Sequence, residues 1–298
     1  MTDKQQPARL GHIDALRGIA ALSVVVAHCC ESMVKGLTGY GATQSLIGGV
    51  SVTWFDIGRF GVILFFLISG FVIPYSLKGD RPLEKFAVSR LFRLYPAYWL
   101  SMAATMVVAG GLGLAAYTPL QVAANVTMVP GLLKQEYISG VYWTLFVELV
   151  FYVACAMLFA LRLLRNAELI LLIGLGCTAV PLAGIAARAL GIGAPIVYLT
   201  AHLAFLFAGY LMRLAVLDGF PRAGRYAAAV ILFGLLAMPI LAAQPDHKFT
   251  VATPLGVTLA GIAGVLAFVL VNRRPFRPSA SLVWRGRSAI RSTCSTSR

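Results

Sequence analysis

Three ionisable residues share one stripe of the first apolar segment, residues 13–33. Arg17 and His28 are eleven residues apart, which at 100° per residue places them within about 20° of each other on a helix. Asp14 lies about 40° from His28 on the same projection. An imidazole can take a proton from a hydroxyl group or carry an acyl group, and a guanidinium can oppose a developing oxyanion. Spacing alone equally allows a structural His28 and an interfacial Asp14–Arg17 ion pair.

Two further polar groups follow in the chain. Arg90 and Arg93 lie three residues apart in F-A-V-S-R-L-F-R-L-Y-P-A-Y-W (86–99), so they share one face of a short helix and can grip a phosphate. Their spacing by itself favours a simpler role in setting membrane topology. Glu148 stands in Y-W-T-L-F-V-E-L-V-F-Y (142–152), stacked between Thr144 and Tyr152 at i,i+4. It is either functional or a structural carboxylate that pairs with an arginine.

The elements that must position these residues are transmembrane helices. Apolar types make up 59% of the chain and charged types 12%, whereas soluble domains carry about 25% charged residues. The mean hydropathy is +0.83. Apolar runs of about 20 residues, the length that crosses a bilayer, predict an all-α bundle of about eight spans. We expect the spans at 13–33, 56–77, 94–114, 141–161, 169–187, 196–215, 226–243 and 253–272.

The net charge of +14 does not indicate nucleic-acid binding, because the basic residues lie between the spans. One side of the predicted bundle holds 20 of the 25 Lys and Arg residues, which predicts a cytoplasmic N-terminus in the cell membrane. We interpret Arg59, Arg188 and His202, near span ends, as interface anchors. The five cysteines form no C-x-x-C pair, so we expect neither a metal site nor a disulfide framework.

Four motifs occur in a specific order. They are H-I-D-A-L-R-G-I-A-A-L-S-V-V-V-A-H (12–28), F-F-L-I-S-G-F (65–71), R-L-F-R-L-Y-P (90–96) and W-T-L-F-V-E (143–148). Together they resemble membrane acyltransferase family 3, which includes O-acetylases of O-antigen and other cell-surface polysaccharides. The resemblance runs from about residue 9 to about residue 284.

The resemblance implies a membrane O-acyltransferase with no permanently bound cofactor. Acyl-CoA, for which acetyl-CoA is the expected form, would bind from the cytoplasmic side and acylate a hydroxyl of a cell-surface or lipid-linked carbohydrate. The family's functional residues fall on Arg17, His28, the arginine pair and Glu148 with its neighbouring Trp143. We therefore expect catalysis by His28, Arg17 and Glu148, donor binding by Lys85, Arg90 and Arg93, and substrate contacts by Asp14, Trp143 and Tyr152.

The individual roles stay open. His28 is either a general base or an acyl carrier, Arg17 lines the donor's path or opposes the oxyanion, and Glu148 orients His28 or the acceptor. A transporter or flippase with a charged pathway is the alternative function. Inverted hydropathy repeats would favour it, and none is clear in the sequence.

The tail departs from the family pattern. We assign residues 1–273 to the membrane domain and 274–298 to a basic, Ser/Arg-rich tail. The family continues with a motif such as W-L-G-x-I-S-Y-S-x-Y-L-x-H. Residues 288–297 can be back-translated so that a reading frame two bases later encodes S-Y-S-L-Y-L-L-H-V. This predicts a frameshift near residues 284–287 and the loss of about two spans; a divergent tail is the alternative. Resequencing the gene decides between them.

Overall fold

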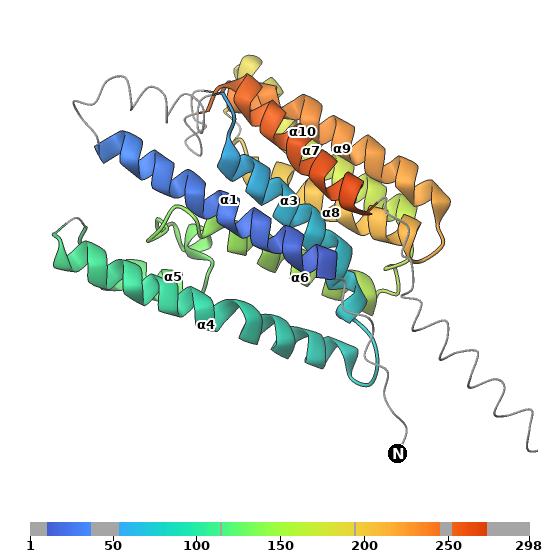
Figure 1. The fold of residues 1–298 in the computed structure, drawn as a ribbon, viewed down its shortest axis with the longest axis horizontal. Helices are drawn as coiled ribbons and strands as arrows, with labels where there is room; N and C mark the ends of the chain where they lie inside the picture. The colour runs from blue at the N-terminus through green and yellow to red at the C-terminus, as the bar shows by residue number, and fades with distance from the viewer. Residues whose placement is uncertain (1–10, 37–53, 114, 194, 245–251, 273–298) are drawn as a thin grey trace, which may run out of the picture.

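The computed structural model describes residues 11–36, 54–113, 115–193, 195–244 and 252–272. Helices and short connections account for these ranges, with no strand within them (Figure 1). The predicted all-helical class is therefore confirmed. The elements are α1 (Gly11–Gly36), α3 (Ile57–Val72), η2 (Ile73–Ser76), α4 (Pro82–Gly111), α5 (Pro119–Val126), η3 (Pro130–Leu133), α6 (Trp143–Ala160), α7 (Ala167–Ala189), α8 (Tyr198–Val216), α9 (Pro221–Ala242) and α10 (Pro254–Asn272).

Seven of the described helices are long and apolar enough to cross a bilayer: α1, α3 with η2, and α6 to α10. The remaining predicted span, 94–114, falls in the second half of α4, which is not one of these seven helices. That helix also contains the charged segment before the span, and it continues through Pro96 as one rod of 30 residues. Arg90 and Arg93 are therefore rigidly connected to a membrane-length helix.

Helices α3 and α8 form the centre of the bundle. They are buried over 72% and 67% of their spanning windows, against 17% for α1. Their backbones touch where they cross, since a Cβ at Gly70 would collide with the Leu206 carbonyl and one at Gly209 with the Leu67 carbonyl. Small residues permit this close approach of membrane helices. The crossing fixes which side chains of α3 and α8 meet.

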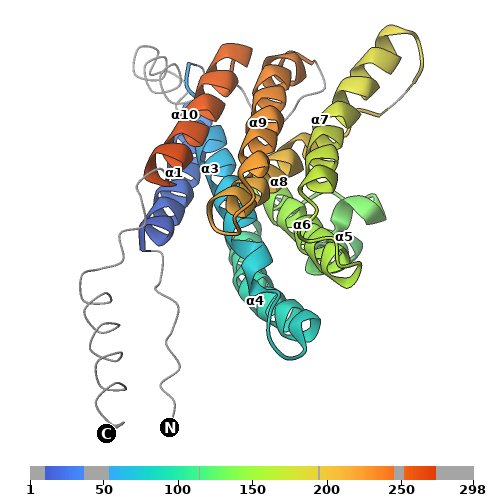
Figure 2. The ribbon, with the colours of Figure 1, turned by 90° about the vertical axis from the view of Figure 1, so that its right-hand side faces the viewer.

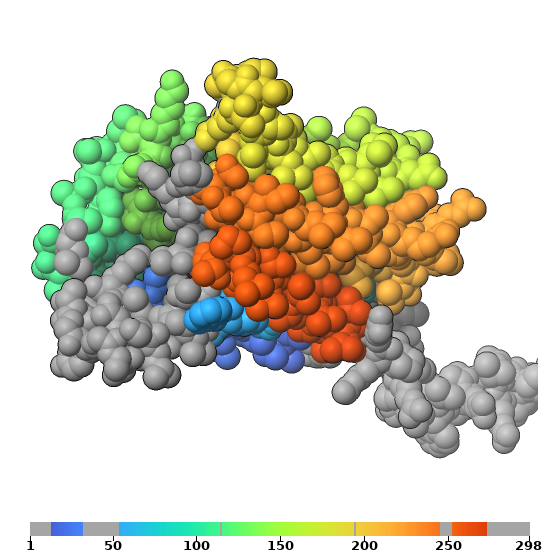
Figure 3. All heavy atoms as spheres, turned by 90° about the horizontal axis from the view of Figure 1, so that it is seen from above, coloured from blue at the N-terminus to red at the C-terminus, as the bar shows by residue number. Residues whose placement is uncertain are grey.

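Helix α1 lies antiparallel to α3 along one flank of this centre (Figure 1). A Cβ at Gly61 would lie 2.6 Å from the Ala20 carbonyl oxygen, and one at Gly58 would lie 3.1 Å from the Ala27 Cβ. Helices α10, α9 and α7 build the opposite flank and form one face of the molecule (Figures 2 and 3). Two glycines of α3 thus bring the stripe of α1 close to the core.

Helix α4 lies at the edge of the bundle (Figures 1 and 2). Its first half contacts α6, where the rings of Phe86 and Tyr152 pack edge to face at 5.9 Å. Its second half contacts the segment before α6 through the rings of Tyr98 and Tyr142, 4.8 Å apart. The Tyr98 hydroxyl also donates to the Asn125 carbonyl at 2.6 Å. The first half and the middle of α4 are therefore held against α6 and the segment before it.

One sequence prediction falls outside the described residues. It concerns the tail from 274 to 298 with the proposed frameshift, and it stays a prediction.

Candidate functional site

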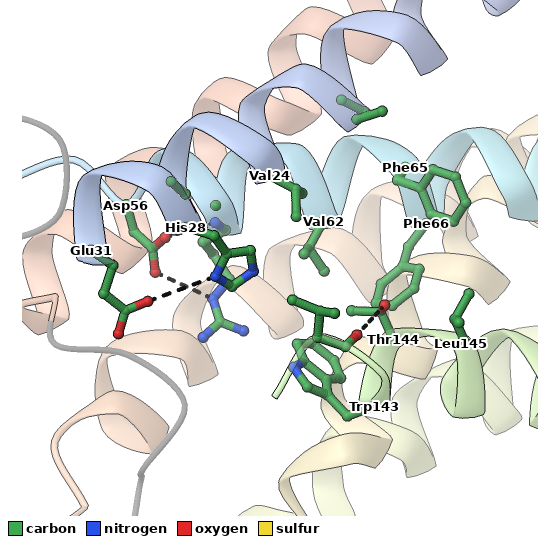
Figure 4. Close-up of a pocket in the computed structure, with 16 residues that line it drawn as sticks. Val24, His28, Glu31, Asp56, Val62, Phe65, Phe66, Trp143, Thr144 and Leu145 are labelled. Carbon is green, nitrogen blue, oxygen red and sulfur yellow. Dashed lines mark hydrogen bonds and ion pairs between the residues drawn. The ribbon is translucent and has the colours of Figure 1, made fainter. Parts of the chain in front are cut away.

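A pocket of about 310 Å³ opens between α1, α3 and the start of α6 (Figure 4). We call it the His28 pocket. Apolar side chains such as Val24, Val62 and Leu145 make up much of its wall. Its polar and aromatic lining residues are His28, Glu31, Asp56, Arg59, Phe65, Phe66, Trp143 and Thr144.

His28 lies on the α1 side of this pocket with a side chain that is 50% exposed. Its Nδ1 is 3.8 Å from a carboxylate oxygen of Glu31, one turn further along α1 (Figure 4). The imidazole is therefore accessible to a bound molecule, and its orientation can be set by the neighbouring carboxylate.

Asp56 and Arg59 form a polar wall of the pocket at the start of α3, and His202 of α8 contacts Arg59 from behind that wall. Asp56 caps α3 by accepting from the Arg59 amide at 2.7 Å, and its other carboxylate oxygen lies 3.7 Å from Arg59 Nε. The Arg59 Nη1 is hydrogen-bonded to His202 Nε2. Arginine has only donors, so Nε2 accepts and Nδ1–H donates to the Tyr198 carbonyl at 3.3 Å. His202 is therefore bound as the neutral tautomer protonated on Nδ1.

The sequence prediction for two of these residues was wrong. Arg59 and His202 are only 6% and 8% exposed, so neither is an interface anchor. They lie on the two central helices, where a polar side chain cannot reach the surface and must find buried partners. Arg188, by contrast, is exposed near the end of α7.

Trp143 is held at the same wall by aromatic packing. Its ring centroid lies 4.7 Å from that of His202 and 6.3 Å from that of Phe66, which it meets edge to face. The indole therefore depends on α3 and α8 for its position. It lines the pocket, and its predicted contact with substrate stays a prediction.

A second group of polar residues lies towards the N-terminal end of α1. We call it the arginine cluster: Arg17, Arg90, Arg93, Glu148 and Tyr152. Glu148 is 1% exposed, and its Oε1 accepts from the Tyr152 hydroxyl at 2.6 Å. The charges of Glu148 and Arg93 both act on the Arg17 guanidinium. Helices α1, α4 and α6 thus each supply a charge to one place.

Two other residues border this cluster. Asp14 pairs with Arg17 across 3.9 Å, as the i,i+3 spacing predicted. Ser69 of α3 donates to Glu148 Oε1 at 3.4 Å and is fully buried. The sequence analysis missed Ser69, although a hydroxyl within the apolar run F-F-L-I-S-G-F was a usable signal.

The cluster has spare hydrogen-bond donors. Nε and Nη2 of Arg17, and Nε and Nη1 of Arg90, are buried and have no hydrogen-bond partner within the described part of the chain. The Arg90 guanidinium lies 5.6 Å from the ring centres of both Phe86 and Tyr152, which hold it over α6. Buried donors without partners are unfavourable unless a ligand satisfies them. Forked guanidinium groups suit phosphate or carboxylate oxygens.

The His28 pocket and the arginine cluster adjoin on three helices. Ala20, Phe66 and Leu145 line the pocket. A step of three residues from each of them leads to Arg17, Ser69 and Glu148. The step runs backwards along α1 and forwards along α3 and α6, so in space it has the same direction on all three helices. That step corresponds to a rise of about 4.5 Å. The two sites are therefore successive levels of one bundle interior.

The predicted site residues thus divide between two levels. Arg17, Arg90, Arg93, Glu148 and Tyr152 come together, whereas His28 and Trp143 line the pocket. Arg17 and His28 share the predicted stripe but are about 16 Å apart along α1. Lys85 is exposed and lies about 140° around α4 from Arg90, so its part in donor binding stays a prediction.

The family model of the acyltransferase domain of family 3 matches residues 10–290. The chain belongs to this family of membrane acyltransferases. Nodulation protein 10 of Rhizobium leguminosarum bv. viciae is 32% identical over 170 residues, which cover 49% of this chain and 43% of that protein. No solved structure gives a significant match. Both levels of the site lie within the part that matches the acyltransferase family.

Proposed function

We propose that this acyltransferase-family member moves an acyl group, normally acetyl, from acyl-CoA to a carbohydrate hydroxyl at the cell membrane. The observation that carries the proposal is a set of buried guanidinium nitrogens of Arg17 and Arg90 that have no hydrogen-bond partner among the described residues. Arg17 lies about one helical turn from a pocket that contains an accessible histidine. The first feature suits an anionic donor, and the second suits hydroxyl chemistry.

The donor would enter at the arginine cluster. The phosphates of CoA would bind Arg90 and Arg93, with Lys85 at the approach, and Asp14 and Tyr152 would border the path of the pantetheine arm. CoA is a cytoplasmic molecule, so this end of the bundle would face the cytoplasm. The bias of 20 of 25 basic residues towards this side supports that orientation.

The acceptor would occupy the His28 pocket. Its carboxylates, Glu31 and Asp56, can accept hydrogen bonds from sugar hydroxyls, and Trp143 offers an apolar ring for the sugar to contact. A surface glycan or a lipid-linked sugar fits these groups equally well.

In direct transfer the acceptor oxygen attacks the thioester carbonyl carbon and the C–S bond breaks. The hydroxyl proton passes to the free ring nitrogen of His28 and from there to the departing thiolate, so the products are an ester and CoA thiol. In the carrier route the imidazole itself attacks the thioester, the C–S bond breaks, and the ring proton passes to the thiolate to give CoA thiol. The acceptor hydroxyl then attacks the acylated imidazole, and its proton returns to the ring as the ester forms. Both routes require His28.

The decisive experiment measures thiol release and acyl transfer in membranes that contain the protein, with radiolabelled acetyl-CoA and a cell-surface glycan fraction. His28→Ala should abolish transfer while the protein still inserts. If the reaction is quenched with acid before acceptor is added, the wild-type chain should carry the radiolabelled acetyl group in the carrier route and should carry none in direct transfer. Solute flux without thiol release would instead support the transporter alternative and refute this proposal.

A further inference from the structure

We propose that Arg59 is a catalytic residue of the transfer, and that Asp56 and His202 are its positioning residues. The inference rests on the proposed function and adds a residue to the reaction at the His28 pocket. The guanidinium of Arg59 would stabilise the negative charge that develops on the acyl carbonyl oxygen when the hydroxyl attacks.

Arg59 and His28 belong to the same level of the bundle. Gly58 touches α1 at Ala27, since a Cβ there would stand 3.1 Å from the Ala27 Cβ. The next residue on each helix is Arg59 and His28, and both line the pocket. An acceptor hydroxyl bound at His28 therefore has the Arg59 guanidinium in the same enclosure.

Arg17 is less suited to this task. It lies about 16 Å from His28 along α1 and takes part in the arginine cluster, where Asp14 and Glu148 balance its charge. A carbonyl within reach of a hydroxyl at His28 is too far from Arg17 for a hydrogen bond. Among the described residues that line the His28 pocket, the arginine is Arg59.

The Arg59 guanidinium is held before any ligand binds. The Asp56 carboxylate forms an ion pair with the guanidinium on one side, 3.7 Å from Nε, and His202 accepts a hydrogen bond from Nη1 on the other. His202 is itself oriented by the Tyr198 carbonyl. Preorganised donors of this kind reduce the reorganisation needed in the transition state, and removing one typically lowers kcat about 100- to 1000-fold.

The charges around the pocket point to a transient anion rather than an anionic acceptor. Among the described residues that line it, Asp56 and Glu31 carry negative charge and Arg59 is the fixed cation. Two carboxylates would repel a charged acceptor such as a uronate or a phosphate. A neutral sugar hydroxyl avoids this repulsion, and its negative charge exists only during the reaction.

The test compares Arg59→Lys and Arg59→Gln with wild type in kcat, in KM for acyl-CoA, and in thermal stabilisation by CoA. CoA should stabilise all three proteins, because the arginine cluster is intact. We expect kcat to fall about 10-fold for Arg59→Lys and about 100-fold or more for Arg59→Gln, with KM changed less than about threefold. Arg188→Gln, at an exposed arginine, should leave kcat unchanged.

Two further variants address folding and positioning. In Asp56→Asn with Arg59→Gln both buried charges are removed together, so no carboxylate is left unpaired, and kcat should still fall about 100-fold. His202→Gln retains an acceptor for Arg59 and should keep more activity than His202→Phe. If Arg59→Lys and the double variant both retained the kcat of the wild-type protein, the inference would be overturned. Absence of transfer by the wild-type protein would instead defeat the proposed function.

Discussion

The Tyr152 hydroxyl donates a 2.6 Å hydrogen bond to the carboxylate of Glu148, one turn earlier on α6. Both side chains are buried, and the charges of Arg90 and Arg93 from α4 act on Tyr152. This bond therefore fixes, within α6, the Tyr152 side chain against which Phe86 and Arg90 of α4 pack. It also keeps a buried carboxylate partnered beside Arg17.

Replacing Tyr152 with phenylalanine should destabilise the protein. The change removes a hydrogen bond to a buried charged group, which typically contributes about 1.5–3 kcal/mol. We expect a lower thermal unfolding midpoint in detergent, measured by the loss of the monodisperse peak after heating. Tyr226→Phe, at a half-buried tyrosine of α9 outside the cluster, is the matched control. Equal midpoints for the two variants would show that the Tyr152–Glu148 bond adds no stability.

Removing either cluster arginine of α4 should weaken donor binding. Arg90→Gln and Arg93→Gln each delete charge-assisted hydrogen bonds to phosphate, so KM for acyl-CoA should rise about 10- to 100-fold with a smaller change in kcat. Saturation kinetics with acetyl-CoA measure this directly. Arg81→Gln, at an arginine 79% exposed on the same side of the bundle, should leave KM unaltered. A normal KM in both cluster variants would place the CoA phosphates elsewhere.

Apolar run lengths predicted the helices well because the bilayer sets them. The expected span 141–161 matches α6, Trp143–Ala160, and 253–272 matches α10, Pro254–Asn272. The stripe on α1 followed from helical periodicity. Periodicity did not reveal that the two ends of this stripe belong to different sites, with Arg17 in the arginine cluster and His28 in the His28 pocket.

The Arg59–His202 pair could not be predicted in the same way. The two residues are 143 positions apart, and they meet because α3 and α8 cross at Gly70 and Gly209. No local pattern encodes that crossing. A weaker signal was available, since Asp56 and Arg59 stand at i,i+3 at the start of an apolar run, where an aspartate can cap the helix.

The proposed orientation can be tested with single cysteines in a cysteine-free background. Lys134→Cys lies between η3 and α6, and Arg162→Cys follows α6 at the other end of that helix. We expect a membrane-impermeant maleimide to label Lys134→Cys in intact cells and Arg162→Cys only after permeabilisation, because basic residues collect on the cytoplasmic side. The opposite pattern would put the arginine cluster outside, away from CoA, and would remove the basis for cytoplasmic donor binding.

The crossing of α3 and α8 should tolerate no added methyl group. Gly70→Ala places a Cβ against the Leu206 carbonyl, and backbone atoms cannot move aside as a flexible side chain can. Overpacking typically costs about 1–3 kcal/mol, and the shift would also displace Ser69 and the Arg59–His202 contact. We expect Gly70→Ala to lower both the thermal midpoint and the transfer rate. Gly176→Ala in α7, where a Cβ meets nothing within 4 Å, should change neither. Full activity in Gly70→Ala would mean that the helices cross elsewhere, and the alignment of Arg59 with His202 would then lack its structural cause.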